Sequence, residues 1–215
     1  MSSSDEIQEK PPRAERLDGY VIRSSTPDDA AAITALANLP GYRYGTLRLP
    51  YQTVAETHQY LENPAPGAKK LVADMDGVII GDIFLGPLQG RRRHVGTIGM
   101  GVHDDFVGRG VGSALMKAAI DLADNWLNLH RLELDVFTDN HDAIRLYEHY
   151  GFVIEGHLRD DAFRDGHYVD AYAMARLKTD AQPSINVSHS SSVITSTPSS
   201  LALSSLEPAP GPATT

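Results

Sequence analysis

The stretch Val107-Gly108-Arg109-Gly110-Val111-Gly112 carries glycine at alternate positions and joins two segments of different character. Residues 93–103 before it favour a strand with interior glycines, which mark a bulge or a close approach to the backbone. Residues 113–129 after it repeat apolar side chains at helical spacing. A glycine-rich turn at a helix start leaves several N–H groups in one small space, where the helix dipole favours an anion. The stretch therefore predicts a phosphate or pyrophosphate cradle.

The glycine spacing does not match two common nucleotide-binding motifs. Gly108, Gly110 and Gly112 are spaced G-x-G-x-G, whereas dinucleotide-binding turns have G-x-G-x-x-G. No lysine followed by serine or threonine closes a P-loop. On this motif alone, an ordinary strand-to-helix turn remains an alternative.

A second motif lies thirty residues further on, in a helix predicted from Asn140 to Tyr150. Asn140 stands at its N-terminal cap, and Tyr147 follows about two turns later on the same face. Taken singly, Asn140 fits a plain helix cap and Tyr147 fits a packed core phenol. Their combination with the glycine turn is more specific than either residue.

Together these segments resemble the GCN5-related N-acetyltransferase (GNAT) superfamily, and the resemblance covers residues 19–178. The matching pieces are the bulged strand before the turn, the glycine turn itself, and the segment Asn140…Ala143-Ile144-Arg145-Leu146-Tyr147…Tyr150-Gly151-Phe152…Glu155-Gly156. Within the superfamily, the sequence is most similar to bacterial L-amino-acid N-acetyltransferases, through Leu71-Val72-Ala73, Asp124-Asn125-Trp126-Leu127, Val136-Phe137-Thr138-Asp139-Asn140 and residues 168–176. One departure is Val107, because the family's loop usually opens with Gln or Arg.

The resemblance implies an α/β (α+β) GNAT fold. This is a mixed, mostly antiparallel seven-stranded sheet flanked by about four helices and splayed between strands 4 and 5. Residue patterns predict strands near 20–23, 70–74, 78–85, 93–103, 131–138, 152–158 and 167–175, and helices near 26–41, 50–61, 113–129 and 140–150. In the third helix, Leu115, Ala119, Leu122 and Trp126 are expected to share a buried face.

The resemblance also implies acetyl-CoA as the acetyl donor, bound in the cleft where the strands splay. The backbone of Met100 and Val102 would pair with the pantetheine amides, and Asn140 would hydrogen-bond the same arm. The N–H groups of the cradle would hold the pyrophosphate; its residues are Val107, Gly108, Arg109, Gly110, Val111, Gly112 and Ser113.

The transfer reaction needs an oxyanion donor and a proton for the departing thiolate. A backbone N–H near Met100 is the candidate donor, and Tyr147 is the candidate acid, since a phenol with a pKa near 10 stays protonated at neutral pH. We expect direct transfer in a ternary complex. The general base is left open among Asp82, His94, His103, Glu133, Asp135 and water. An α-amine with a pKa near 8 is already partly neutral at pH 7, so a dedicated base is not obligatory.

The acceptor is expected to meet the loop of residues 41–50. Arg43 or Arg48 would bind a carboxylate, and Tyr42, Leu47 or Leu49 would contact an apolar side chain; a solvated surface loop is the alternative. The prediction is transfer to a small-molecule amine, the α-amine of a free L-amino acid. Protein N-termini or lysines, and an inactive acetyl-CoA-binding module, are the alternatives.

Composition limits the other classes of function. The chain has 215 residues, no cysteine and a formal net charge of −9. The missing cysteine excludes disulfides, thiolate metal sites and a cysteine nucleophile. The acidic balance argues against nucleic-acid and anionic-membrane partners. Histidine spacing indicates no metal site.

The ends of the chain differ from its middle. Residues 1–18 are polar and predict a disordered lead-in, and residues 179–215 predict a disordered tail rich in Ser, Thr and Pro or, alternatively, a docking segment. The acetyltransferase domain is assigned to 19–178. A cytoplasmic location is expected, because no membrane span or secretory signal is found, and the resemblance makes a homodimer an option.

Overall fold

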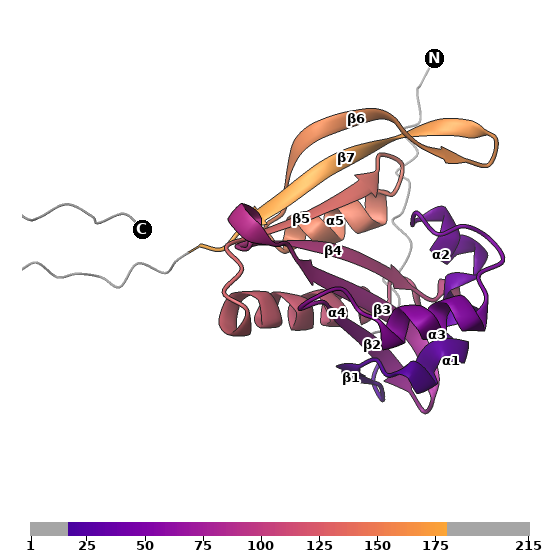
Figure 1. The fold of residues 1–215 in the computed structure, drawn as a ribbon. Helices are drawn as coiled ribbons and strands as arrows, with labels where there is room; N and C mark the ends of the chain where they lie inside the picture. The colour runs from indigo at the N-terminus through magenta and orange to yellow at the C-terminus, as the bar shows by residue number, and fades with distance from the viewer. Residues whose placement is uncertain (1–16, 180–215) are drawn as a thin grey trace, which may run out of the picture. The chain divides into compact units, whose positions relative to one another are not determined.

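The computed structural model describes residues 17–179. The predicted lead-in and tail lie outside the described residues, except for residues 17, 18 and 179. Within this range a single sheet is covered by five α-helices (Figure 1). The strands are β1 Val21–Ser24, β2 Lys69–Met75, β3 Val78–Pro87, β4 Val95–Val102, β5 Arg131–Phe137, β6 Val153–Arg164 and β7 His167–Leu177. The helices are α1 Ala30–Ala37, α2 Pro40–Tyr44, α3 Val54–Glu62, α4 Val111–Asp121 and α5 His141–His149.

The sheet has seven strands in the order β1-β2-β3-β4-β5-β7-β6, and only the β4–β5 pair is parallel. Its parallel ladder spans only Val95↔Arg131 to Thr97↔Glu133. β4 continues to Val102 without pairing to β5, so the predicted splay between strands 4 and 5 is confirmed. The candidate active site is built around this open edge of β4.

Two hydrophobic clusters define the layers. Residues of α4 and α5, such as Leu115 and Tyr147, pack with one face of the sheet. Residues of α1 and α2, such as Ile33 and Tyr42, pack with Val72 and Ile79 on the other. Elements that follow the glycine turn therefore cover one face, and elements that precede β2 cover the other. Among the described helices, none is long and apolar enough to cross a membrane.

Two predicted helix boundaries needed correction near residues 40–53. The segment after Pro40, predicted as a loop, forms the short helix α2, which brings the count to five helices. The helix predicted from Pro50 begins only at Val54, because Thr53 and Glu56 form a capping box. The Glu56 carboxylate accepts the Thr53 N–H at 2.9 Å and the Thr53 hydroxyl accepts the Glu56 N–H at 3.3 Å.

The prediction that Trp126 packs in the core is wrong. Leu115 and Ala119 are buried as expected, but Trp126 is 76% exposed. α4 passes into a π-helical turn over Leu122–Trp126, in which the Leu127 N–H donates to the Leu122 carbonyl. A π turn holds more residues than an α turn, so side chains within and after it, Trp126 among them, leave the α-helical phase. Ala123 takes the buried position instead.

The last hairpin is longer than predicted. β6 continues to Arg164 past a bulge between Leu158 and Ala162, where the sequence shows no apolar alternation. Asp165 and Gly166 close it with positive φ values of 49° and 88°, the conformation that a type I′ turn requires. The extra length brings the tip of the hairpin to α2.

Candidate active site

Beyond Thr97, the edge of β4 that faces β5 pairs with no strand among the described residues. The N–H of His103 donates to Ile80 and the N–H of Leu88 donates to the Val95 carbonyl, both at 2.9 Å. Because backbone direction alternates along a strand, Met100 and Val102 direct their N–H and C=O groups away from β3, toward the gap beside β5. Both residues are half-buried, and an unpaired strand edge offers N–H and C=O groups to a partner, so this edge suits an extended ligand that carries amides.

The glycine turn forms the helix N-terminus that was predicted. Gly108 and Gly110 have positive φ values of 76° and 92°, which favour glycine. α4 begins at Val111, and its first helical bond runs from Ala114 N–H to Gly110. The N–H groups that precede it are free of intrahelical partners.

Gly112 brings this helix end close to the open strand. A Cβ on Gly112 would lie 3.3 Å from Met100 Cε and 3.3 Å from Leu146 Cδ2. The cradle and the unpaired edge of β4 are therefore adjacent. The side chain of Val107 is half exposed, and Arg109 stacks on Phe106 with its Cζ 5.4 Å from the ring centre.

Asn140 caps α5 and keeps one end of its side chain free. Its Oδ1 accepts the Ala143 N–H at 3.2 Å, while its Nδ2 makes no hydrogen bond within residues 17–179. A Cβ on Gly45 would lie 3.1 Å from this Nδ2, so the end of α2 contacts Asn140 closely. The free amide can serve as a donor beside the splay.

Tyr147 is 7% exposed and packs its ring 6.0 Å from that of Phe152. Its hydroxyl has no hydrogen-bond partner among the described residues. Burial raises the pKa of the phenol to about 12. Tyr147 therefore stays protonated across the working pH range and has a proton to donate.

Tyr150 is a residue that the sequence analysis did not assign. Its hydroxyl donates to the Ser113 carbonyl at 2.9 Å and lies 2.7 Å from the Ser113 Oγ. The contact joins the first turn of α4 to the end of α5. In the sequence, the one signal for Tyr150 was its position three residues after Tyr147 in the segment 140–152.

The short helix α2 holds Tyr42 against the open strand. The Asp104 carboxylate accepts the N–H groups of Gly41 and Tyr42, each at 2.9 Å, and so caps α2 from a distant segment. The Tyr42 ring lies directly over Gly101, where a Cβ would be 2.1 Å from Cε2. Its hydroxyl donates to Asp82 Oδ1 at 2.7 Å. Burial, reinforced by Asp82, raises the pKa of this phenol well above its usual range.

A hollow of about 250 Å³, here called the α1–α3 hollow, lies beside Tyr42. Its lining comprises Ile33, Ala37, Tyr42, Arg48, Leu49, Pro50, Tyr51, Gln52, Glu56, Thr57, Tyr60, Lys70 and Asp82. On its wall the ammonium of Lys70 lies 2.5 Å from Asp82 Oδ2, with both side chains nearly buried. Arg48 makes no ion pair within the described residues, so it is the available cation there.

Two other predicted acceptor residues stand apart from the α1–α3 hollow. Leu47 is 71% exposed and does not line it, whereas Leu49 does. Arg43 does not line it either. Its Nε is buried and has no hydrogen-bond partner within residues 17–179, although nearly all buried donors in proteins are paired.

The candidate bases differ in their surroundings. Asp82 is engaged by Lys70 and Tyr42. The Glu133 carboxylate contacts Arg92 and Arg131, each at 2.6 Å.

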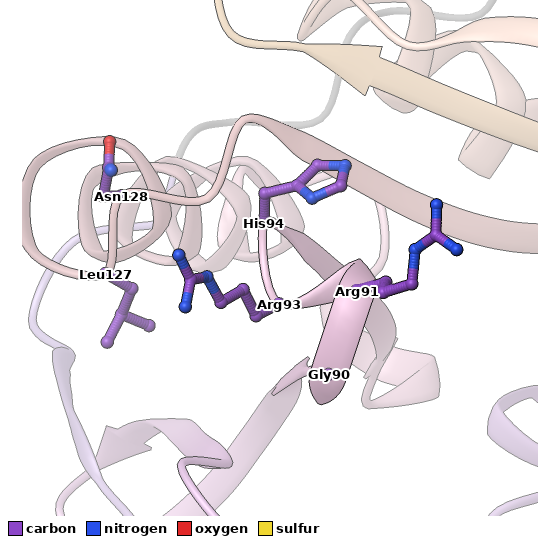
Figure 2. Close-up of a pocket in the computed structure, with 6 residues that line it drawn as sticks. All are labelled: Gly90, Arg91, Arg93, His94, Leu127 and Asn128. Atoms are coloured by element: carbon purple, nitrogen blue, oxygen red, sulfur yellow. The ribbon is translucent and has the colours of Figure 1, made fainter. Parts of the chain in front are cut away.

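The two histidine candidates are also poorly placed. The His103 Nδ1 accepts the Asp105 N–H at 3.2 Å. His94 lines a second hollow, of about 920 Å³, at the closed end of the β4–β5 ladder, with Gly90, Arg91, Arg93, Leu127 and Asn128 (Figure 2). There the side chains of Arg91 and Arg93 extend in opposite directions.

Asp135 is the remaining candidate base. The β4–β5 register, continued past Thr97↔Glu133, would set Asp135 opposite Gly99 at the position where the strands separate. A Cβ on Gly99 would meet nothing within 4 Å, so this position is open. Asp135 makes no hydrogen bond through its carboxylate within residues 17–179. Burial, with the charges of Asp161 and Glu133, raises its pKa.

Comparison with known proteins identifies the class. The sequence profile of the acetyltransferase (GNAT) family matches residues 40–152, and the chain belongs to this family. Members of the family use acetyl-CoA as donor, and the chain is an N-acetyltransferase. Among residues 17–179, no group of three or more His, Asp or Glu side chains could hold a metal ion.

Individual relatives narrow the comparison. The chain is 43% identical to the L-amino acid N-acetyltransferase AaaT of Escherichia coli over 161 residues, which cover 74% of this chain and 98% of that protein. A GNAT acetyltransferase from Streptococcus pneumoniae superposes with a TM-score of 0.66 at 30% identity, covering 74% of this chain and 99% of that one. Spermidine N-acetyltransferase from Vibrio cholerae, in complex with CoA and spermine, gives 0.67 at 26% identity, covering 74% and 95%.

Proposed function

We propose that this protein transfers the acetyl group of acetyl-CoA to the α-amine of a free L-amino acid, by direct attack in a ternary complex. The observation that carries the acceptor is the 43% identity to an L-amino acid N-acetyltransferase across nearly all of that protein's length. The splay of β4 from β5 beside a helix N-terminus supports the donor. A cytoplasmic location and a homodimer remain predictions.

The residues around the splay fit acetyl-CoA. The free backbone groups of Met100 and Val102 would pair with the pantetheine amides, and Asn140 would donate from its free Nδ2. The cradle of Val107 to Ser113 would receive the pyrophosphate through N–H groups and the helix dipole. Because the cradle uses backbone groups, a protein of net negative charge can hold a polyanion. Val107, in place of the family's usual Gln or Arg, would remove only a side-chain contact.

Tyr147 would supply the proton that the departing thiolate needs. A cysteine-like thiol has a pKa near 8.5 in water, below the value of about 12 for this phenol. Desolvation in the cleft disfavours the thiolate as well, which narrows that difference. A backbone N–H near Met100, on the open edge, would stabilise the oxyanion.

Asp135 is the proposed base for the acceptor ammonium. Among the candidates it alone combines a position at the splay with a carboxylate free of ion pairs in the described range. Its raised pKa improves it as a proton acceptor near neutral pH. The negative charges of Asp135 and the neighbouring Asp161 would also attract an ammonium group.

Arg48 is the proposed partner of the acceptor carboxylate. It lines the α1–α3 hollow together with Lys70, and Lys70 already compensates the charge of Asp82. Glu56 also lines the hollow, but its carboxylate already accepts the Thr53 N–H at 2.9 Å. The hollow therefore offers the guanidinium of Arg48, which has no ion pair in the described range, while Asp135 offers a negative charge. A zwitterionic amino acid matches this pair better than a polyamine, which carries only positive charge.

A thiol-release assay tests the proposal. Purified protein is mixed with acetyl-CoA and, separately, with amino acids, their decarboxylated amines, polyamines or short peptides. We expect the highest kcat/KM for free amino acids, and a loss when the carboxylate is removed. A preference for polyamines or peptides would refute the acceptor assignment, and no release with any amine would indicate a binding module.

A further inference from the structure

Three segments that lie far apart in the sequence meet at the guanidinium of Arg164. Arg164 ends β6 and donates through Nη1 to the Tyr44 carbonyl at 3.0 Å. The same guanidinium forms an ion pair with Asp139, which follows β5. The Tyr44 hydroxyl donates to Asp139 Oδ2 at 3.0 Å. We call Arg164, Asp139 and Tyr44 the Arg164 clasp.

The geometry of the clasp is that of a specific contact. The Arg164 side chain is only 10% exposed and its Cζ lies 3.7 Å from the centre of the Tyr44 ring and 4.9 Å from that of Phe137. A planar guanidinium suits both stacking and a forked contact with a carboxylate, which lysine cannot reproduce. The hydrogen bond from Arg164 holds the pKa of Asp139 below its usual range, so the ion pair persists at neutral pH.

The clasp stands between the two halves of the active site. Asp139 immediately precedes Asn140, the residue proposed to hold pantetheine. Tyr44 immediately precedes Gly45, which packs on Asn140. α2 also carries Tyr42, which covers Gly101 and lines the α1–α3 hollow. The clasp thus connects α2, on the acceptor side, to the cap of α5, on the donor side. It also connects α2 to the tip of the β6–β7 hairpin, through the bond from Arg164 to the Tyr44 carbonyl (Figure 1).

We propose that Arg164 is a positioning residue for the acceptor. By holding α2 against the β6–β7 hairpin, it closes the acceptor side of the splay and favours a small free amine over an amine carried on a polypeptide. The inference rests on the proposed transfer to a small amine. Arg164 lies outside the proposed catalytic and cofactor-binding residues, and its proposed role is to select free amines over amines on a polypeptide.

The test compares Arg164→Gln with a matched control. Arg176 is buried to a degree similar to Arg164, and it pairs with Asp124 of the π turn through two hydrogen bonds of 2.9 and 2.8 Å. Asp124 is more buried than Asp139, and neither Arg176 nor Asp124 lines the α1–α3 hollow. Arg176→Gln therefore reports the cost of losing a partly buried ion pair as such. Tyr44→Phe removes only the hydroxyl contact with Asp139 and serves as a milder variant that keeps the ring.

Steady-state kinetics use the free amine on which the wild type is most active, and a short peptide with a free N-terminus and one lysine. For Arg164→Gln we expect the KM of the free amine to rise roughly tenfold, the KM of acetyl-CoA to change less than threefold and the ratio of peptide to free-amine kcat/KM to rise. Tyr44→Phe should move in the same direction by a smaller factor. Arg176→Gln should leave the KM values and this ratio unchanged.

Thermal unfolding of all three variants separates this effect from loss of stability. Equal changes in the acceptor KM for Arg164→Gln and Arg176→Gln would overturn the inference, as would an unchanged acceptor KM in Arg164→Gln. A wild type that prefers the peptide to every free amine would overturn it too. If the preferred free amine is not an amino acid, the proposed acceptor fails, but the clasp is still judged by the same comparison.

Discussion

Replacing Gly101 by alanine is expected to displace Tyr42, because the two occupy adjoining space. A Cβ at Gly101 would lie 2.1 Å from Tyr42 Cε2 and 2.6 Å from two further ring atoms. Carbon atoms in contact are about 3.5 to 4.0 Å apart, so the ring or strand has to move by about 1.4 Å or more. The Tyr42 hydroxyl bonds Asp82 at 2.7 Å, and a shift of that size breaks the bond.

The cost follows from these contacts. Losing a hydrogen bond to a charged, buried group costs about 1.5 to 3 kcal/mol, and overpacking a core site costs about 1 to 3 kcal/mol. The two costs overlap, because the ring shift that relieves the overpacking is the same shift that breaks the hydrogen bond. We therefore expect a loss of roughly 2 to 5 kcal/mol in the free energy of unfolding. For a domain of this size that corresponds to a melting temperature roughly 5 to 15 °C lower.

Gly99 provides the matched control, because it lies on the same face of β4 and a Cβ there would meet nothing within 4 Å. Gly99→Ala should melt within about 2 °C of the wild type, since no packing is disturbed. Thermal unfolding of both variants, followed by circular dichroism, is the assay. Equal melting temperatures for Gly101→Ala and Gly99→Ala would refute the placement of Tyr42 over Gly101.

Four further variants test the proposed chemistry. Tyr147→Phe should lower kcat by roughly ten- to a thousandfold with little change in acetyl-CoA affinity; unchanged turnover would exclude it as the acid. Asp135→Asn should lower kcat/KM at neutral pH and abolish its rise with pH, because a carboxyl with a raised pKa accepts a proton only above that pKa. The same variant should unfold no more easily at pH 7, since it removes repulsion from Asp161; a pH profile like that of the wild type would count against the base. Tyr150→Phe should raise the KM of acetyl-CoA roughly three- to tenfold at unchanged kcat, and a fall in kcat alone would contradict a role in holding the cradle. Arg48→Ala should raise the KM of amino acids roughly tenfold but not that of decarboxylated amines, and equal effects on both would dismiss the carboxylate contact.

The backbone conformation of the proposed donor site could largely be predicted from the sequence, because it is local. The cradle depends on glycines that adopt positive φ and on the helix that begins after them. Asn140 and Tyr147 share a face because the helical repeat sets their spacing. Residues within about ten positions of one another are related by backbone geometry alone, so their pattern is readable without the fold.

The acceptor side could be predicted only as a segment. The loop of residues 41–50 was assigned to it, but its helical part and its position depend on Asp104, more than sixty residues away. Arg48 lines the α1–α3 hollow and Leu47 does not. Lys70 and Asp82 complete the hollow from strands whose register no local pattern specifies.

By itself, the sequence determined the alternation of strands and helices, the glycine turn and the pair of Asn140 and Tyr147, because repeat and turn preferences act over a few residues. Tertiary structure alone decided three things. It set the point where β4 and β5 part, the contact of Tyr42 with Gly101 and the meeting of Arg164 with Asp139. These depend on strand register and on side chains from distant segments, whose energies arise only once the sheet has assembled.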